Sequence, residues 1–298
     1  MCRVSDEIEL CYETFGDPSD PPLLLVMGLA MQMIGWPDDF CRALAERGFY
    51  TIRFDNRDAG RSTHVDAPPP TLAQLILRSR RAAAYTIADM ADDAAGLLGE
   101  LGVAPAHVVG ASMGGMIVQA LAARQPETVR SLVSIMSTTG GRFVGQPALQ
   151  AYPLFVRRPR RGRDAAIERA VRAFRVIGSR GLPRDEAMVR DLAARSYDRD
   201  RDAAAPGRQL AAIFASGDRT AELARIDAPT LVIHGTDDRL IGPSGGRATA
   251  RAIPGARLLT IDGMGHDLPR AAWPQIIDAI VGHAARSSAP RSSEIAAP

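Results

Sequence analysis

A serine set among small residues is the first feature of this chain that could do chemistry. Residues 110–114 read Gly-Ala-Ser-Met-Gly, directly after the apolar run 107–109 and directly before a helix-like segment that starts at Gly114. A strand that turns sharply into a helix with serine at the turn is a nucleophile elbow, in which small neighbours allow a strained backbone that exposes the hydroxyl. The pattern predicts that Ser112 is a nucleophile, and a glycine-rich packing turn is the alternative.

A serine hydroxyl needs a neighbouring base to remove its proton, and the base needs an acid that holds its tautomer and orientation. Two loops downstream carry such groups. Asp237 and Asp238 follow the apolar run 230–233, and His266 follows the run 258–261. Because His266 lies in a loop without apolar periodicity, it is the predicted general base. The remaining histidines lie in strand-like runs, a polar loop or the last helix: His64, His107, His234 and His283.

Composition excludes several classes of function. The 298 residues carry 36 basic and 34 acidic side chains, so the chain has no strong overall field that would attract nucleic acid or an anionic membrane. Aromatic residues make up 5%, which leaves few platforms for stacking bases. Three cysteines without C-x-x-C spacing argue against disulfides and a zinc site. We expect a cytoplasmic protein without signal peptide, membrane span or nucleic-acid partner, either a monomer or a homodimer.

Short apolar runs alternate with helix-like segments, and this alternation predicts a mostly parallel sheet covered by helices on both faces. The runs 23–27 and 49–54 are typical of buried parallel strands, and residues 8–15 alternate as a surface strand does. In the predicted helix 86–101, Thr86 and Asp89 are spaced as a capping box. The other predicted strands are 107–109, 132–136, 230–233 and 258–261, and the other predicted helices are 38–47, 114–124 and 271–284.

Two segments interrupt this rhythm. Prolines 68–70 open an insertion in which apolar residues from Leu72 to Leu77 have helical spacing. The segment 140–227 has helical patterns at 164–177, 184–195 and 207–215 but no strand, which predicts a helical cap over the strand ends. The predicted organisation is a core at 1–139 and 228–285, a cap at 140–227 and a disordered tail at 286–298. A basic run in the cap is predicted to form a solvated loop face, with attraction of an anionic substrate as the alternative: Arg157, Arg158, Arg160, Arg161 and Arg163.

Six stretches of sequence form a combination that is more specific than any one motif. They are 23–28 (Leu-Leu-Leu-Val-Met-Gly), 35–37 (Gly-Trp-Pro), 55–63 (Asp-Asn-Arg-Asp-Ala-Gly-Arg-Ser-Thr), 106–110 (Ala-His-Val-Val-Gly), 112–114 (Ser-Met-Gly) and 263–266 (Gly-Met-Gly-His). Together they resemble the α/β-hydrolase-fold serine esterases from residue 8 to about residue 283, and more narrowly the aclacinomycin methylesterase group of actinobacterial hydrolases. The resemblance implies a mostly parallel central sheet flanked by helices, with the helical cap inserted before the strand that bears the acid.

The same resemblance implies a role for each candidate residue. In the family the acid and then the histidine follow the serine, each after a later strand. The acid usually lies three residues after the glycine that ends its strand, which favours Asp238, with Asp237 as the alternative. The oxyanion hole is expected from the backbone amides of Met113 and Leu29. Many relatives have His-Gly where this chain has Met27-Gly28, a departure shared with the methylesterase group that keeps the backbone donor.

The chemistry that this resemblance predicts is hydrolysis of a carboxylic ester through an acyl-enzyme, without a metal or an organic cofactor. The predicted substrate is a small to medium, apolar ester, and Met33 and Trp36 are predicted to line its pocket. Lactonases, amidases, carbon–carbon hydrolases and perhydrolases keep the same three side chains and are alternatives, as is a non-catalytic small-molecule binder on this fold. Asp55, Arg57 and Gly60 are expected to make a buried, charge-assisted structural contact.

Overall fold

The computed structural model describes residues 1–77, 80–156 and 162–288. Within these residues, one sheet has the strand order β3-β5-β4-β6-β7-β8-β9, in which β3 pairs antiparallel with β5 and all other neighbours pair parallel. Its strands are β3 (Tyr12–Phe15), β4 (Pro22–Val26), β5 (Tyr50–Phe54), β6 (Ala106–Ala111), β7 (Val129–Ile135), β8 (Thr230–Gly235) and β9 (Arg257–Ile261). A separate antiparallel pair is formed by β1 (Cys2–Arg3) and β2 (Glu9–Leu10).

Strand β4 is buried on both faces, which is why it reads as a short apolar run. In β4, Leu24 and Val26 belong to one core cluster, and Leu23 and Leu25 belong to the other. The first cluster includes residues of α3 (Ile87–Glu100) and α4 (Met113–Arg124), and α9 (Thr220–Leu223) and α10 (Ser244–Ala252) pack on the same side. The second includes residues of α1 (Asp38–Ala45) and α11 (Trp273–Ser288). The two clusters make a three-layer α/β/α core.

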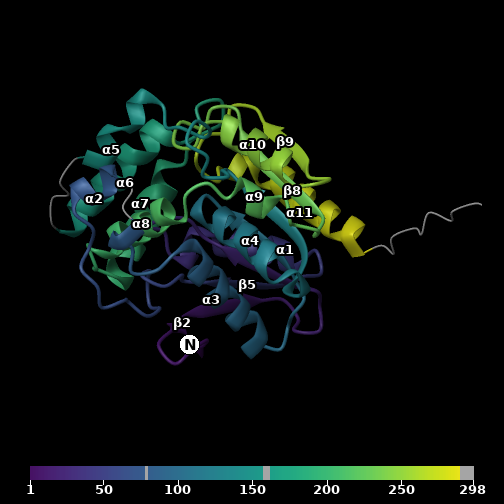
Figure 1. Ribbon diagram of the computed structural model, residues 1–298. Coiled ribbons are helices and arrows are strands. Elements are labelled where there is room, and N and C mark those ends of the chain that lie inside the picture. Colours follow the sequence, from purple (N-terminus) through teal and green to yellow (C-terminus); the bar gives the residue numbers. More distant parts are fainter. Residues whose placement is uncertain (78–79, 157–161, 289–298) are drawn as a thin grey trace, which may run out of the picture.

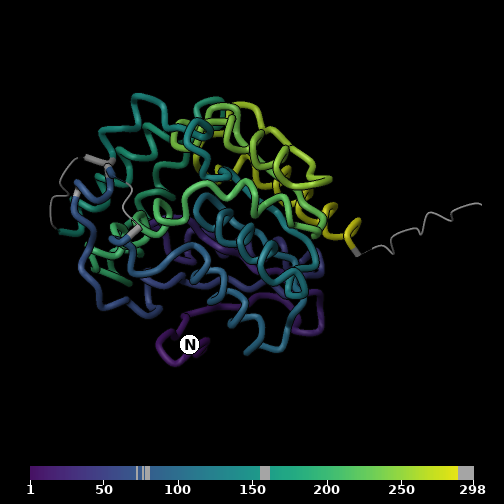
Figure 2. The backbone as a smooth tube through the Cα atoms, in the orientation of Figure 1, coloured from purple at the N-terminus to yellow at the C-terminus, as the bar shows by residue number. Residues whose placement is uncertain are grey.

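Between β7 and β8 the chain leaves the core and forms a group of helices: α5 (Pro153–Val156), α6 (Arg163–Ile177), α7 (Glu186–Arg199) and α8 (Ala205–Ser216). Figure 1 shows this group at one end of the sheet, where α2 (Leu72–Ile76) joins it, and α2 contacts α8. Figure 2 follows the same path from teal to green before the chain returns to β8. These helices lie in the segment predicted as the cap, and we use that word for them below.

The predicted fold class and most predicted elements are confirmed, including the capping box, in which Thr86 Oγ1 accepts from the Asp89 amide and the Asp89 carboxylate accepts from the Thr86 amide. The prediction of one strand over 8–15 is wrong, since β2 and β3 belong to different sheets. The tail predicted from residue 286 is helical through Ser288, where α11 ends. Residues 289–298 of that tail and residues 157–161 of the basic run lie outside the described residues.

Candidate active site

The elbow between β6 and α4 holds its serine in a strained backbone conformation. Ser112 has φ +57° and ψ −118°, a region that side chains with a Cβ rarely adopt. Neighbouring strand ends hold this geometry, because the Ser112 amide donates to the Ile135 carbonyl over 2.9 Å and the Ser137 hydroxyl donates to the Ser112 carbonyl over 2.8 Å. The constraint keeps the Ser112 side chain partly exposed at the carboxyl end of the sheet.

Glycine is required at the start of α4 because the helix packs against the backbone of β4. A Cβ added at Gly114 would lie 2.1 Å from the Val26 carbonyl oxygen. We expect Gly114→Ala to lower the free energy of unfolding by about 3 kcal/mol, the upper part of the usual range for overpacking. The matched control is Gly99→Ala on the exposed side of α3, where an added Cβ meets nothing within 4 Å.

Urea denaturation measures the free energy of unfolding of both variants. The control is expected to be about 0.5–1 kcal/mol more stable than the wild type, because alanine loses less backbone entropy in a helix. A Gly114→Ala variant as stable as the wild type would show that the elbow does not need close contact with β4.

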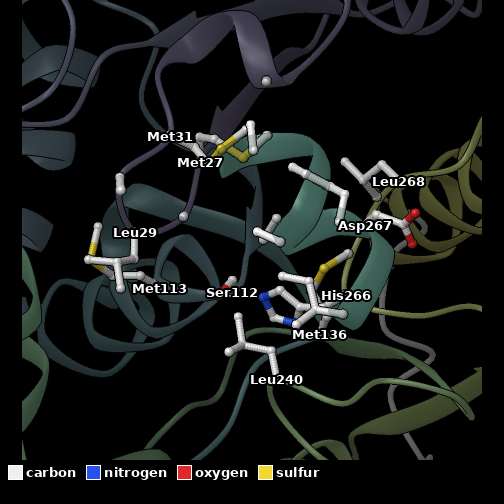
Figure 3. Close-up of a pocket in the computed structure, with 18 of the residues that line it drawn as sticks. Met27, Leu29, Met31, Ser112, Met113, Met136, Leu240, His266, Asp267 and Leu268 are labelled. Atoms are coloured by element: carbon white, nitrogen blue, oxygen red, sulfur yellow. Dashed lines mark hydrogen bonds between the residues drawn. The ribbon is translucent and has the colours of Figure 1, made fainter. Parts of the chain in front are cut away.

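The structure brings Ser112, His266 and Asp238 together from three separate loops. The Ser112 Oγ lies 2.9 Å from His266 Nε2, and His266 Nδ1 lies 2.8 Å from Asp238 Oδ2. Figure 3 shows the imidazole beside the hydroxyl in the pocket. His266 follows β9 and its amide donates to the carbonyl of Ile177, the last residue of α6. His266 is therefore held by both the core and the cap.

Asp238 carries its charge in a buried position. Burial raises its pKa, but the neighbouring imidazoles of His266 and His234 more than offset this and lower the pKa to about 2. The Oδ1 atom also accepts from the amides of Leu240 and Ile241, each over 2.9 Å. With this carboxylate ionised, hydrogen bonding assigns the imidazole proton to Nδ1 of His266, which leaves Nε2 free to accept the hydroxyl proton of Ser112.

A second histidine contacts the same carboxylate, a contact that sequence reasoning did not predict. His234 is buried at the end of β8, and its Nε2 lies 2.8 Å from the Ile241 carbonyl oxygen and 3.4 Å from Asp238 Oδ2. A strand histidine most often satisfies backbone groups, and His234 does so here. The signal that could have marked it is its place four residues before Asp238, at the end of the strand that leads to this carboxylate.

Leu29 and Met113 lie next to Ser112 on the side away from the imidazole, as Figure 3 shows. The loop after β4 passes directly beside the serine, since a Cβ added at Gly28 would lie 3.0 Å from the Ser112 Cβ. Within the described part of the chain, neither the Leu29 amide nor the Met113 amide donates to another group of the protein. Both donors are thus available to an oxygen bound near the Ser112 hydroxyl.

Ser112 and His266 line a large cavity of about 1330 Å³ between the core and the cap. Its walls are mainly apolar and include flexible thioether side chains that adapt to ligands of different shape. The methionines that line it are Met27, Met31, Met113, Met116, Met136 and Met188, and the aromatic residues are Tyr152, Phe174, Tyr197 and Phe214. Figure 3 shows Met27, Met31 and Met136 around the serine and the histidine.

The structure does not bring Met33 and Trp36 into this lining, so the predicted pocket needs correction. Both side chains are almost completely buried. Trp36 packs on Phe40 in the core cluster of α1 and α11, with ring centroids 5.5 Å apart. The short helix Met33–Gly35 turns these two side chains inward, while Met31, Ile34 and Gly35 of the same loop line the cavity.

The loop after β5 makes the buried, charged contacts expected of it. Arg57 donates to Asp93 on α3 over 2.6 Å, and the buried Asp55 pairs with Arg199 at the end of α7. A Cβ at Gly60 would lie 2.2 Å from the Asp55 carboxylate. One cluster in the described residues has metal-ligand geometry, Asp58 with His64 and Asp202. Arg208 donates to both of these carboxylates, so a cation already compensates their charge.

A mostly parallel sheet with a serine elbow after its central strand, and an acidic residue and a histidine after later strands, is the arrangement of the α/β hydrolases. The model of the α/β hydrolase fold family matches residues 21–269, and the chain belongs to this family. It is similar to the rhodomycin D methylesterase DauP of Streptomyces sp. strain C5, with 33% identity over 93% of this chain and 95% of the relative. The rhodomycin D methylesterase DnrP of Streptomyces peucetius is 31% identical over 94% and 96%.

Solved structures give the same result. A hydrolase from Pseudomonas aeruginosa PA01 superimposes with a TM-score of 0.70 and 27% identity, covering 95% of both chains. None of the helices in the described residues combines the length and apolar character needed to cross a membrane.

Proposed function

We propose that this protein is a serine hydrolase that cleaves carboxylic esters through an acyl-enzyme. The observation that carries the proposal is the continuous hydrogen-bonded chain from the Ser112 hydroxyl through His266 to the ionised Asp238. A serine next to such a base becomes a nucleophile at neutral pH, which a serine in an ordinary turn does not.

In the proposed mechanism, Ser112 Oγ attacks the ester carbonyl while His266 Nε2 takes the hydroxyl proton. The protonated imidazole then gives this proton to the leaving alcohol, and the acyl group stays on Ser112 as an ester. Water, deprotonated by the same Nε2, attacks this ester, and the imidazolium returns the proton to Ser112 Oγ as the acid is released. Asp238 orients His266 and stabilises its charged form. The amides of Leu29 and Met113 stabilise the oxyanion of both tetrahedral intermediates.

The substrate that we propose is a methyl ester of an apolar molecule. The volume of the cavity and its methionine and aromatic lining support an apolar acid portion. Two relatives with more than 30% identity over most of this chain are named rhodomycin D methylesterases, which supports a methyl ester as the group cleaved. A cytoplasmic site of action is part of the proposal, and the three free cysteines support it.

A panel of substrates tests this function. Purified protein is incubated with methyl esters of apolar aromatic acids, with short p-nitrophenyl esters, and with lactones and amides of similar size. Turnover of the esters, with covalent labelling by a fluorophosphonate, is the expected result. Tight binding of these compounds without turnover of any of them, and without labelling, would contradict the proposal and favour a small-molecule binder.

A further inference from the structure

The loop that carries the Leu29 amide has a backbone that does not hold its shape by itself. Ala30, the next residue, has φ +59°, in the left-handed region where residues with a Cβ are strained. Within the loop, the Met31 amide donates to the Gly28 carbonyl over a long 3.2 Å. To be effective, the donor of an oxyanion hole must keep its position to within a fraction of an ångström. Other parts of the protein therefore have to fix this loop.

A glutamine of the cap contacts the peptide group that follows the proposed donor. Gln209 lies on α8 and is fully buried. Its Oε1 accepts from the Ala30 amide over 2.9 Å, and its Nε2 donates to the Arg57 carbonyl over 2.9 Å and faces the Asp58 carbonyl at 3.4 Å. The single side chain thus joins the loop after β4 to the loop after β5.

The helix that carries Gln209 is itself fixed on the core. Arg208, the residue before it, donates to both oxygens of the buried Asp58 over 2.9 and 2.6 Å. Because residues 208 and 209 hold the same loop after β5, Gln209 has little freedom to follow a movement of Ala30. Adjacent residues of α8 therefore hold the loop after β4 against the loop after β5.

We propose that Gln209 is a positioning residue for the oxyanion hole. By accepting a hydrogen bond from the Ala30 amide, Gln209 fixes the backbone on the carboxyl side of Leu29. This in turn fixes the direction in which the Leu29 amide donates. The cap then contributes to stabilising the transition state as well as to enclosing the substrate. This inference rests on the proposed function, since it assigns a role in that reaction.

Two substitutions separate positioning from packing. Gln209→Met keeps the length of the side chain and removes its hydrogen bonds to Ala30 and to the loop after β5. Gln209→Glu keeps an oxygen that accepts from the Ala30 amide. The matched control is Ser216→Ala on the same helix, which removes the hydroxyl that accepts the Ile87 amide over 3.0 Å and does not line the cavity. The readouts are kcat and KM for an ester substrate and the affinity for phenylboronic acid, whose adduct with serine places an oxygen in the oxyanion hole.

We expect Gln209→Met to lower kcat about 10- to 100-fold, less than the loss for deleting a donor, and to weaken phenylboronic acid binding by a similar factor, with KM changed less than threefold. Gln209→Glu is expected to retain several-fold more activity, and Ser216→Ala full activity. Should Gln209→Met not fold, Gln209→Asn takes its place, because its side chain is one methylene too short to reach Ala30.

The inference is overturned if the folded Met or Asn variant keeps kcat and phenylboronic acid affinity within twofold of the wild type, or if only KM rises. Equal losses in the Glu and Met variants would also overturn it, since the contact with Ala30 would then not matter. Failure of the proposed function is a different result, in which the wild type itself neither cleaves esters nor reacts with a fluorophosphonate.

Discussion

Ser112→Ala is expected to lower kcat for ester cleavage by about 10⁴- to 10⁶-fold, the loss typical of removing the nucleophile of a serine hydrolase. In the proposed mechanism the hydroxyl oxygen is the atom that bonds to the acyl carbon, and no other hydroxyl is hydrogen-bonded to His266 in the described residues. Alanine keeps a Cβ, so the substitution leaves the strained backbone and the packing of the elbow in place. KM is expected to change little, because the cavity walls are unchanged. Initial rates with a p-nitrophenyl ester measure the effect.

A second variant shows that this loss is chemical and does not come from unfolding. Ser112→Gly also removes the hydroxyl, but glycine accepts φ +57° without strain, which typically costs about 1–3 kcal/mol for other residues. The glycine variant is therefore expected to be as inactive as the alanine variant and at least as stable as the wild type in thermal unfolding. Both are expected to lose labelling by a fluorophosphonate. Retention of more than about 1% of activity by either variant would exclude Ser112 as the nucleophile.

The parts of this molecule that sequence predicts well are those specified by neighbouring residues. The turn at Ser112 needs small residues on both sides, and a Cβ at Gly110 or Gly114 would lie about 2 Å from backbone atoms. The capping box at Thr86 is likewise contained within four residues. The buried strand β4 is a short run of large apolar residues, as burial on both faces requires. In each case a short stretch of sequence carries the signal, although the contact that requires Gly114 is made with Val26 of β4.

Predictions about the pocket were less successful, because closeness along the chain does not determine where a side chain faces. Met31 and Met33 lie in the same loop, yet Met31 lines the cavity and Met33 is buried. The direction of each depends on the helical turn Met33–Gly35 and on the aromatic cluster beneath it. No local pattern specifies such a turn.

Contacts between distant segments were beyond the reach of sequence reasoning. Gln209 and Ala30 are 179 residues apart, and neither belongs to a motif. Sequence patterns also do not predict helix α10, because it is rich in glycine and alanine and contains no large apolar residue. The structure explains this composition: a Cβ at Gly246 would lie 2.5 Å from Nδ1 of His234, so the helix can approach β8 only with glycine at this position.

The choice between the two adjacent aspartates gives the second large prediction. Asp238→Asn is expected to lower kcat about 10⁴-fold, because it reverses the hydrogen bonding of His266. The amides of Leu240 and Ile241 both donate to Oδ1, so they hold the oxygen of an asparagine at that position. Its amide nitrogen then faces Nδ1 of His266 and donates to it. The imidazole proton moves to Nε2, which can no longer accept the proton of Ser112.

Asp237→Asn is the matched control, since it makes the same change of charge one residue away. The backbone amide of Asp237 donates to the Met264 carbonyl, a contact that the substitution keeps, and His266 contacts the carboxylate of Asp238 and not that of Asp237. We therefore expect Asp237→Asn to change kcat less than threefold. Steady-state kinetics on both variants with one ester decides between the residues. If Asp237→Asn caused the large loss, or if Asp238→Asn kept kcat within tenfold of the wild type, the acid would have to be reassigned, because tautomer control of His266 depends on that one carboxylate.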